Sequence, residues 1–164
     1  MKSRVAVLCA MLVVSFGPAW AGSLQDDNKA KFQQFYDQVV NKGDLAKIND
    51  FIAEDFVEHE PFPGLGTDRD SVKKFFMSMR EAFPDLKFDV HFMLAEGDLV
   101  AAYITMSGTQ KKEFAGIPSM GKKFSVSTVD IIRVSDGKAV EHWGATDTMQ
   151  MMEQLGAMPE PEGK

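Results

Sequence analysis

The apolar residues of this chain recur with two different periods, which divide it into a helical part and a β part. The first predicted helix covers residues 26–42 and ends at Gly43, because five apolar residues follow the helical spacing i, i+3, i+4, i+7 and i+8. These residues are Phe32, Phe35, Tyr36, Val39 and Val40. A short helix is predicted over residues 44–52, and another runs from about Asp70 to Pro84. Between them, residues 57–67 break the pattern and are predicted to be a loop.

From Leu86 onwards the apolar residues alternate with polar ones, which is the period of a half-buried β-strand. Four strands are predicted, over residues 86–94, 99–109, 123–134 and 139–146, and a short helix follows that ends at Gly156. The last two strands are joined by Ser135-Asp136-Gly137-Lys138, which is typical of a β-hairpin. Helices followed by a run of antiparallel strands predict an α+β domain, in which the helices cover one face of the sheet.

The N-terminus has the layout of a signal peptide. Two basic residues precede an apolar run over residues 5–16, Gly17-Pro18 breaks that run, and Ala19-Trp20-Ala21 supplies small residues for a cleavage site. The run is shorter than the roughly 20 apolar residues that a membrane-spanning helix needs. We therefore expect residues 1–21 to be removed on export, leaving a periplasmic or secreted single domain over residues 22–164, with a frayed tail from about residue 157.

Composition narrows the range of partners. The chain has 18 Lys and Arg against 24 Asp and Glu, and loss of Lys2 and Arg4 with the signal peptide leaves 16 against 24. An acidic chain without a basic cluster is unsuited to nucleic acid, so we expect no nucleic-acid partner, and no membrane association after cleavage. Cleavage also removes Cys9, the only cysteine, so the mature fold would depend on its core rather than on disulfides.

Several short motifs lie in a fixed order between about residue 30 and residue 156. They are Asn41-Lys42-Gly43-Asp44, Phe56-Val57-Glu58-His59, Phe83-Pro84-Asp85, Gly97-Asp98-Leu99-Val100, Gly108-Thr109, Glu113-Phe114-Ala115-Gly116-Ile117-Pro118, Asp136-Gly137-Lys138 and Glu141-His142-Trp143. Together they resemble the SnoaL-like polyketide cyclase (ester cyclase) group of the NTF2-like, or cystatin-like, fold. The resemblance implies a curved antiparallel sheet wrapped by the N-terminal helices into a cone, with a ligand pocket in its mouth.

The same resemblance implies an activity and an assembly. In the polyketide cyclases a pocket aspartate acts as acid and base in the intramolecular aldol closure of a polyketide ester, and the matching position here is Asp147. The implied enzyme is a cofactor-independent cyclase or isomerase that acts on a small, apolar, carbonyl-containing molecule. Many members are dimers that pair through the sheet. The predicted strand 99–109 has apolar residues on both faces, so we expect a homodimer.

Asp147 and His59 are the predicted catalytic residues. Asp147 follows an apolar strand, where desolvation would raise its proton affinity, although an N-cap for the final helix is the alternative role. His59 lies in the loop and is either a proton relay or a surface histidine packed beside Pro61. If Asp147 faces the pocket, strand alternation places Trp143 on the same face and His142 on the opposite one, unless a bulge reverses the order.

Five residues complete the predicted substrate site: Trp143, Tyr103, Asp130, His142 and Tyr36. Asp130 lies on a largely apolar strand face, which indicates either a pocket residue or an acid paired with a nearby Tyr or His. The three histidines lie on separate elements without metal-ligand spacing, so we expect neither a metal nor a cofactor. The sequence leaves a periplasmic binding module without turnover as the alternative to an enzyme.

Overall fold

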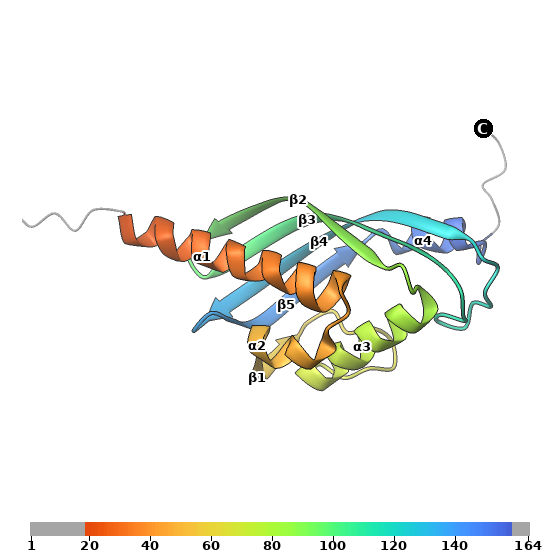
Figure 1. Ribbon diagram of the computed structural model, residues 1–164, viewed down its shortest axis with the longest axis horizontal. Helices are drawn as coiled ribbons and strands as arrows, with labels where there is room; N and C mark the ends of the chain where they lie inside the picture. The colour runs from red at the N-terminus through yellow and green to blue at the C-terminus, as the bar shows by residue number, and fades with distance from the viewer. Residues whose placement is uncertain (1–18, 159–164) are drawn as a thin grey trace, which may run out of the picture.

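A five-stranded sheet with the strand order β1-β5-β4-β3-β2 carries the fold (Figure 1). The computed structural model describes residues 19–158. Its strands are β1 Ile52–Glu58, β2 Lys87–Glu96, β3 Leu99–Thr109, β4 Lys123–Ser135 and β5 Lys138–Thr146. Strands β2 to β5 pair antiparallel, and β1 joins the edge of the sheet parallel to β5. The predicted α+β fold is therefore confirmed, with a sheet that is mixed rather than wholly antiparallel.

The helices close one face of this sheet. They are α1 Ala19–Phe35, which continues as a π-helical turn over Tyr36–Asn41, a 3₁₀ turn over Leu45–Lys47, α2 Ile48–Phe51, α3 Arg69–Ala82 and α4 Thr148–Leu155. Helix α1 lies across the sheet, α3 lies beside β1, and α4 packs against β4 (Figure 1). Phe35 of α1 packs edge-on against Phe51 of α2 and Phe76 of α3, so the three helices share one aromatic core with the inner face of the sheet.

Strand β1 was missed by the sequence patterns, which predicted a helix as far as residue 52 and a loop from residue 57. In the structure α2 ends at Phe51 and the chain extends at once into β1. Ile52 and Phe56 are the only apolar side chains that β1 buries, and a spacing of four fits a helix as well as a strand. The register of β1 against β5 also shifts between Ile52 and Val57, so no alternation of period two is visible.

Two β-bulges interrupt the alternation of inward and outward side chains, so the residues beyond each bulge lie on the opposite face from the one that strict alternation predicts. In β2 the register shifts between Val90 and Phe92, and beyond it Phe92 and Leu94 are 55% and 65% exposed on the outer face. In β5 the pairing passes from Ala139 to Glu141 while β4 advances by one residue. His142 therefore shares the inner face with Ala139, three positions away, which places it inside the fold.

The predicted signal peptide is covered only in part. Residues 1–18 lie outside the described residues, and so do residues 159–164 of the predicted tail. Helix α1 begins at Ala19, so the predicted cleavage site after Ala21 falls in its first turn. Within residues 19–158, no helix has both the length and the apolar character needed to cross a membrane.

Candidate functional site

A cavity of about 870 Å³ lies between the inner face of the sheet, helices α1 and α3, and the loop that follows β1. This volume is within the range of about 300–1,000 Å³ that is usual for small-molecule sites. Most of its wall is apolar, and the phenylalanines that line it are Phe32, Phe35, Phe56, Phe62, Phe75, Phe76, Phe88 and Phe114. A polar group in such a wall interacts strongly with its neighbours, because the surroundings screen charge poorly.

Four polar side chains from four elements form a connected series on the wall of this cavity. Tyr36, in the turn after α1, donates a hydrogen bond from its hydroxyl to Asp130 Oδ2 on β4 at 2.9 Å. His142 on β5 places its Nδ1 at 2.7 and 2.9 Å from the two carboxylate oxygens of Glu58, at the end of β1. His142 Nε2 lies 3.6 Å from Asp130 Oδ1, which is too long for a hydrogen bond. This Nε2–H can therefore donate to a ligand.

Gly144 makes room for this arrangement. It lies directly across from Asp130 in the β4–β5 register, and it lines the cavity. A Cβ atom at this position would lie 3.0 Å from His142 Cε1 and 3.8 Å from Asp130 Oδ1. The absence of a side chain therefore lets the imidazole lie over the backbone of β5, with its Nε2 turned towards Asp130.

The charges of the site hold His142 in its protonated form. Burial alone would lower the pKa of His142, but the carboxylates of Asp130 and Glu58 outweigh it and raise the pKa to about 10. At neutral pH the ring is therefore an imidazolium with a proton on each nitrogen. Burial, together with the charge of Asp130, raises the pKa of Tyr36 well above its ordinary value, so its hydroxyl remains a neutral donor.

Three of the residues predicted for the site, Tyr36, Asp130 and His142, line the cavity. For Asp130 both sequence alternatives hold, since it is a cavity residue and it has a Tyr and a His as neighbours. The outward facing of His142 was expected only on the premise that Asp147 faces the pocket, and that premise was wrong, because Asp147 lies beyond β5 as the exposed N-cap of α4.

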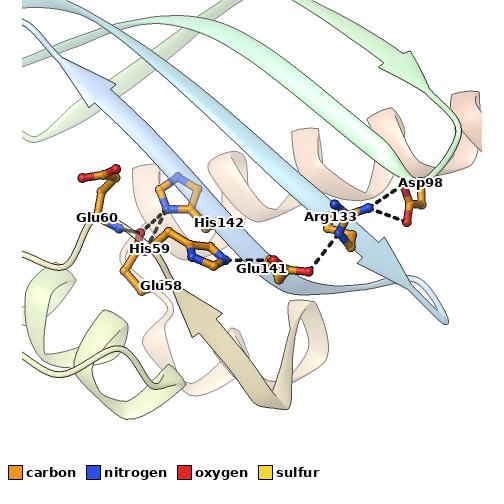
Figure 2. A network of polar contacts seen from close by, with 7 residues as sticks. All are labelled: Glu58, His59, Glu60, Asp98, Arg133, Glu141 and His142. Atoms are coloured by element: carbon orange, nitrogen blue, oxygen red, sulfur yellow. Dashed lines mark hydrogen bonds and ion pairs between the residues drawn. The ribbon is translucent and has the colours of Figure 1, made fainter.

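Asp147 and His59 do not lie in this cavity, so the common cavity expected for them is corrected. Asp147 lies just beyond the end of β5, is exposed, and accepts a hydrogen bond from the Gln150 backbone N–H at 3.0 Å as the N-cap of α4. His59 lies on the outer side of the sheet with its Nε2 at 2.8 Å from Glu141 (Figure 2). The acid and the imidazole that lie side by side in the cavity wall are Asp130 and His142.

Trp143 and Tyr103, predicted to shape the pocket, also lie on the outer side of the sheet. The Trp143 ring stacks on His59, with 4.5 Å between the ring centres. Tyr103 is 36% exposed and its hydroxyl lies 3.0 Å from the Ser127 hydroxyl. Both belong to the alternate set of residues on their strands, opposite to Ala102 and His142, which face inwards.

Glu58 is the residue of this cluster that sequence reasoning did not assign to the site. The signal that could have found it is a repeated dipeptide, because Glu58-His59 in β1 and its loop matches Glu141-His142 in β5. In the parallel pairing of β1 with β5, the acid of each dipeptide contacts the histidine of the other. Glu58 binds His142 inside the fold, and His59 binds Glu141 on the outer side (Figure 2). Glu58 also accepts the backbone N–H of Glu60 at 3.1 Å, which ties the start of the loop to the same carboxylate.

The curved sheet and the helices that cover its inner face enclose a largely apolar cavity, with an acid and an imidazolium in its wall. This arrangement is typical of cone-shaped α+β proteins. Comparison with known families identifies one of them. Residues 30–155 match the family model of the SnoaL-like polyketide cyclases, and the chain belongs to this family. Membership supports a role of the cyclase or isomerase type.

Two curated relatives are the aklanonic acid methyl ester cyclases DnrD of Streptomyces peucetius and DauD of Streptomyces sp. (strain C5). Each is 34% identical to this chain over 68 residues, which is 41% of this chain. The matched segment spans less than half of these relatives, 47% and 42% of their length.

Solved structures match over a larger share of the chain. TsrD from Streptomyces laurentii has a TM-score of 0.75 at 25% identity, covering 82% of this chain and 98% of its own. IdmH, a candidate polyketide cyclase of Streptomyces antibioticus, has a TM-score of 0.69 at 33% identity, covering 79% and 98%. AclR, a candidate hydroxylase of Streptomyces galilaeus, has a TM-score of 0.73 at 30% identity, covering 82% and 99%.

The placement of Asp147 gives a testable prediction. Replacing Asp147 with Asn is expected to leave both stability and ligand binding close to those of the wild type, because Asn caps helices as well as Asp does. Replacing Asp147 with Ala is expected to cost about 1 kcal/mol of unfolding free energy, by loss of the cap of α4. Urea unfolding of the two variants measures both effects. A large loss of activity in the Asn variant would return Asp147 to the active site.

Proposed function

We propose that this protein is an exported, cofactor-independent enzyme of the cyclase or isomerase type that acts on a small, largely apolar carbonyl or ester compound. Asp130 takes up and returns a proton, and His142 stabilises negative charge on the carbonyl oxygen. The observation that carries the proposal is the Asp130 carboxylate beside the His142 Nε2–H on the wall of a largely apolar cavity.

Asp130 Oδ1 and His142 Nε2, which lie 3.6 Å apart, suit the two ends of one carbonyl unit. The carboxylate removes a proton from the carbon next to the carbonyl, and the electrons of that C–H bond form an enolate. The imidazolium donates a hydrogen bond to the enolate oxygen as its charge develops. Proton transfer of this kind, with a positioned acid–base group, is typically worth 10²- to 10⁴-fold in rate.

Ring closure then needs only the substrate and these groups. The enolate carbon attacks a second carbonyl carbon in the same molecule, and the new C–C bond forms as the electrons of that carbonyl move onto its oxygen. The resulting alkoxide takes the proton back from Asp130, so the aldol product contains the atoms of the substrate and nothing is oxidised or reduced. In an isomerisation the proton instead returns to a different carbon.

Two further residues position the reacting groups. Tyr36 occupies Asp130 Oδ2 as a neutral donor, which leaves Oδ1 to face the substrate. Glu58 holds His142 through Nδ1, which fixes the plane of the ring and directs Nε2–H into the cavity.

The test follows the proton rather than a named product. β-Keto esters of increasing size, and aklanonic acid methyl ester, are incubated with the protein in D₂O, and exchange of the proton next to the carbonyl is followed by NMR. Exchange faster than in buffer, and dependent on Asp130, is expected. A compound that binds in the cavity without any exchange contradicts the proposal and leaves the binding module as the function.

Export is a part of this proposal that mass spectrometry can test. The protein recovered from outside the cytoplasm is expected to begin at Gly22, because cleavage follows Ala19-Trp20-Ala21. Helix α1 would lose only its first three residues, and the core residues from Phe32 onwards would be unaffected. An intact mass that still includes residues 1–21 would exclude this maturation.

We also propose a homodimer that pairs through the outer face of the sheet. This face exposes five large apolar side chains on adjacent strands: Phe92, Leu94, Tyr103, Val129 and Ile131. A contiguous apolar patch of this kind is unusual on a monomer surface and is typical of an interface. The NTF2-like resemblance implies pairing through the same element.

Replacing both Leu94 and Ile131 with Glu is expected to convert the dimer into a monomer, because each charge would be buried without a partner. Light scattering at micromolar concentration measures the mass of each variant. Met77 of α3, which is 53% exposed away from this sheet face, supplies the matched control, and Met77→Glu should remain dimeric. A wild-type protein of monomer mass would contradict this part of the proposal.

A further inference from the structure

The charged groups that line the cavity are of nearly one sign. Glu58, Glu60 and Asp130 contribute carboxylates, and His142 contributes the only cation among the described residues that line it. Neither Lys nor Arg belongs to this lining within residues 19–158. A ligand that enters the cavity therefore meets negative charge that is only partly compensated.

The pairing of these groups shows where the uncompensated charge lies. The imidazolium of His142 is bound directly by both carboxylate oxygens of Glu58, so these two largely cancel. Glu60 is exposed, where water screens it. Asp130 has the neutral Tyr36 hydroxyl as its hydrogen-bond partner, and His142 Nε2 reaches only to 3.6 Å. The net charge of the inner cluster is thus close to −1 and is centred on Asp130.

The aromatic rings next to Asp130 also favour a cation over an anion. The Tyr36 ring stacks on Phe88 with 6.2 Å between the ring centres, and Phe35 packs edge-on against Tyr36 at 5.7 Å. The faces of aromatic rings carry partial negative charge and attract cations, an effect that grows when water is excluded. The faces of these rings therefore favour a cation over an anion.

We propose that this cavity selects its ligands by charge: it takes apolar molecules in uncharged or protonated-amine form and rejects the corresponding carboxylates. This inference rests on the cavity assigned in the proposed function and names the substrate class of that site. An ester or ketone accepts a hydrogen bond from His142 Nε2–H. An ammonium group donates to Asp130 Oδ1. A carboxylate gains only the Nε2–H contact and is repelled by Asp130 and Glu58 at close range.

Three probes of matched shape test this inference. Methyl 2-naphthoate is uncharged, 2-naphthoate is an anion, and 2-naphthylmethylamine is protonated at pH 7. Titration calorimetry at pH 7 with the whole protein is expected to show the ester and the amine binding at least about 10-fold more tightly than the carboxylate, the factor that corresponds to 1.4 kcal/mol. A second titration series in high salt checks that the discrimination arises inside the cavity, where it should largely persist.

Two variants assign the discrimination to Asp130. Asp130→Asn keeps the size of the side chain and an oxygen for the Tyr36 hydroxyl, so the preference against the carboxylate should fall several-fold and the amine should bind more weakly. Asp136→Asn is the matched control, since it removes the same charge from the exposed β4–β5 turn, at a positive φ of 49° that Asn tolerates. It should leave all three affinities unchanged.

Equal affinities for the ester and the carboxylate, tighter binding of the carboxylate, or failure of both the ester and the amine to bind at millimolar concentration would overturn the inference. None of these measurements requires turnover. If proton exchange fails while the order of affinities holds, the proposed reaction is lost and the charge selection stands. If exchange occurs with carboxylates as readily as with esters, the reaction stands and the charge selection is lost.

Discussion

Replacing Asp130 with Asn is expected to lower the rate of proton exchange next to a substrate carbonyl by about 10²-fold or more, the usual scale for a positioned acid–base group. Asn has the same shape and can still accept the Tyr36 hydroxyl at the 2.9 Å position, so the cavity wall should keep its geometry. The amide cannot take up a proton at working pH. NMR exchange rates measure the loss, and thermal unfolding checks that the variant remains folded.

The matched control for this experiment is Asp147→Asn, which makes the same chemical change at the exposed cap of α4. The exchange rate of that variant should stay within a few-fold of the wild type. If Asp130→Asn keeps the full rate and the native melting temperature, Asp130 is not the base. The reaction proposed for this cavity would then have to be abandoned.

The contribution of His142 to stability is expected to vanish at high pH. The pKa of His142 is raised from its ordinary value of 6.5 to about 10 in the folded protein. A raised pKa means that its stabilisation is fully present below about pH 6.5 and is lost as the pH rises through about 10. Each unit corresponds to about 1.4 kcal/mol, and partial exposure of the ring reduces the total, so we expect roughly 2–4 kcal/mol.

Urea unfolding of the wild type and of His142→Gln at pH 6.5 and pH 10 measures this effect. The gap in unfolding free energy between the two proteins should be large at pH 6.5 and should narrow by that amount at pH 10. His91→Gln is the control, since His91 is exposed on the outer face and bonds only to the Thr105 hydroxyl. A gap for His142→Gln that does not change with pH would show that the ring is not held as an imidazolium by Asp130 and Glu58.

How much the sequence could predict depended on how regular each strand is. Strand β4 pairs with β3 without a register shift from Lys123 to Arg133, so alternation placed Asp130 correctly on the inner face. The turn after it also followed its sequence, since Asp136 and Gly137 both have the positive φ that a tight hairpin requires. In β2 and β5 one extra residue reverses the alternation, and nothing in the local sequence marks it. The alternation predicted from Leu86 onwards therefore fails beyond Val90. His142 was set outwards because Asp147 was assumed to face the pocket.

The site itself needed contacts that no single segment contains. Tyr36 and Asp130 are 94 positions apart and Glu58 and His142 are 84 apart, so only the assembled sheet and helices bring them together. Glu58 lies at the end of an irregular edge strand, where the hydrophobic pattern gives no indication of facing. The family resemblance and a position after an apolar strand selected Asp147, and a place in the loop selected His59, but their surroundings in the fold are water and the outer face of the sheet.

The repeated Glu-His dipeptide also favours one alignment of β1 on β5. The observed ladder places Glu58 beside His142, so each acid has an imidazole as its neighbour on both faces of the sheet. A slip by one residue would set Glu58 beside Glu141 and His59 beside His142, with like groups adjacent on either face. The same slip would also turn the buried Ile52 and Phe56 of β1 to the outer face. The mismatch of like groups thus adds to the packing of these two residues in favouring the observed register, and with it the position of the loop that follows β1.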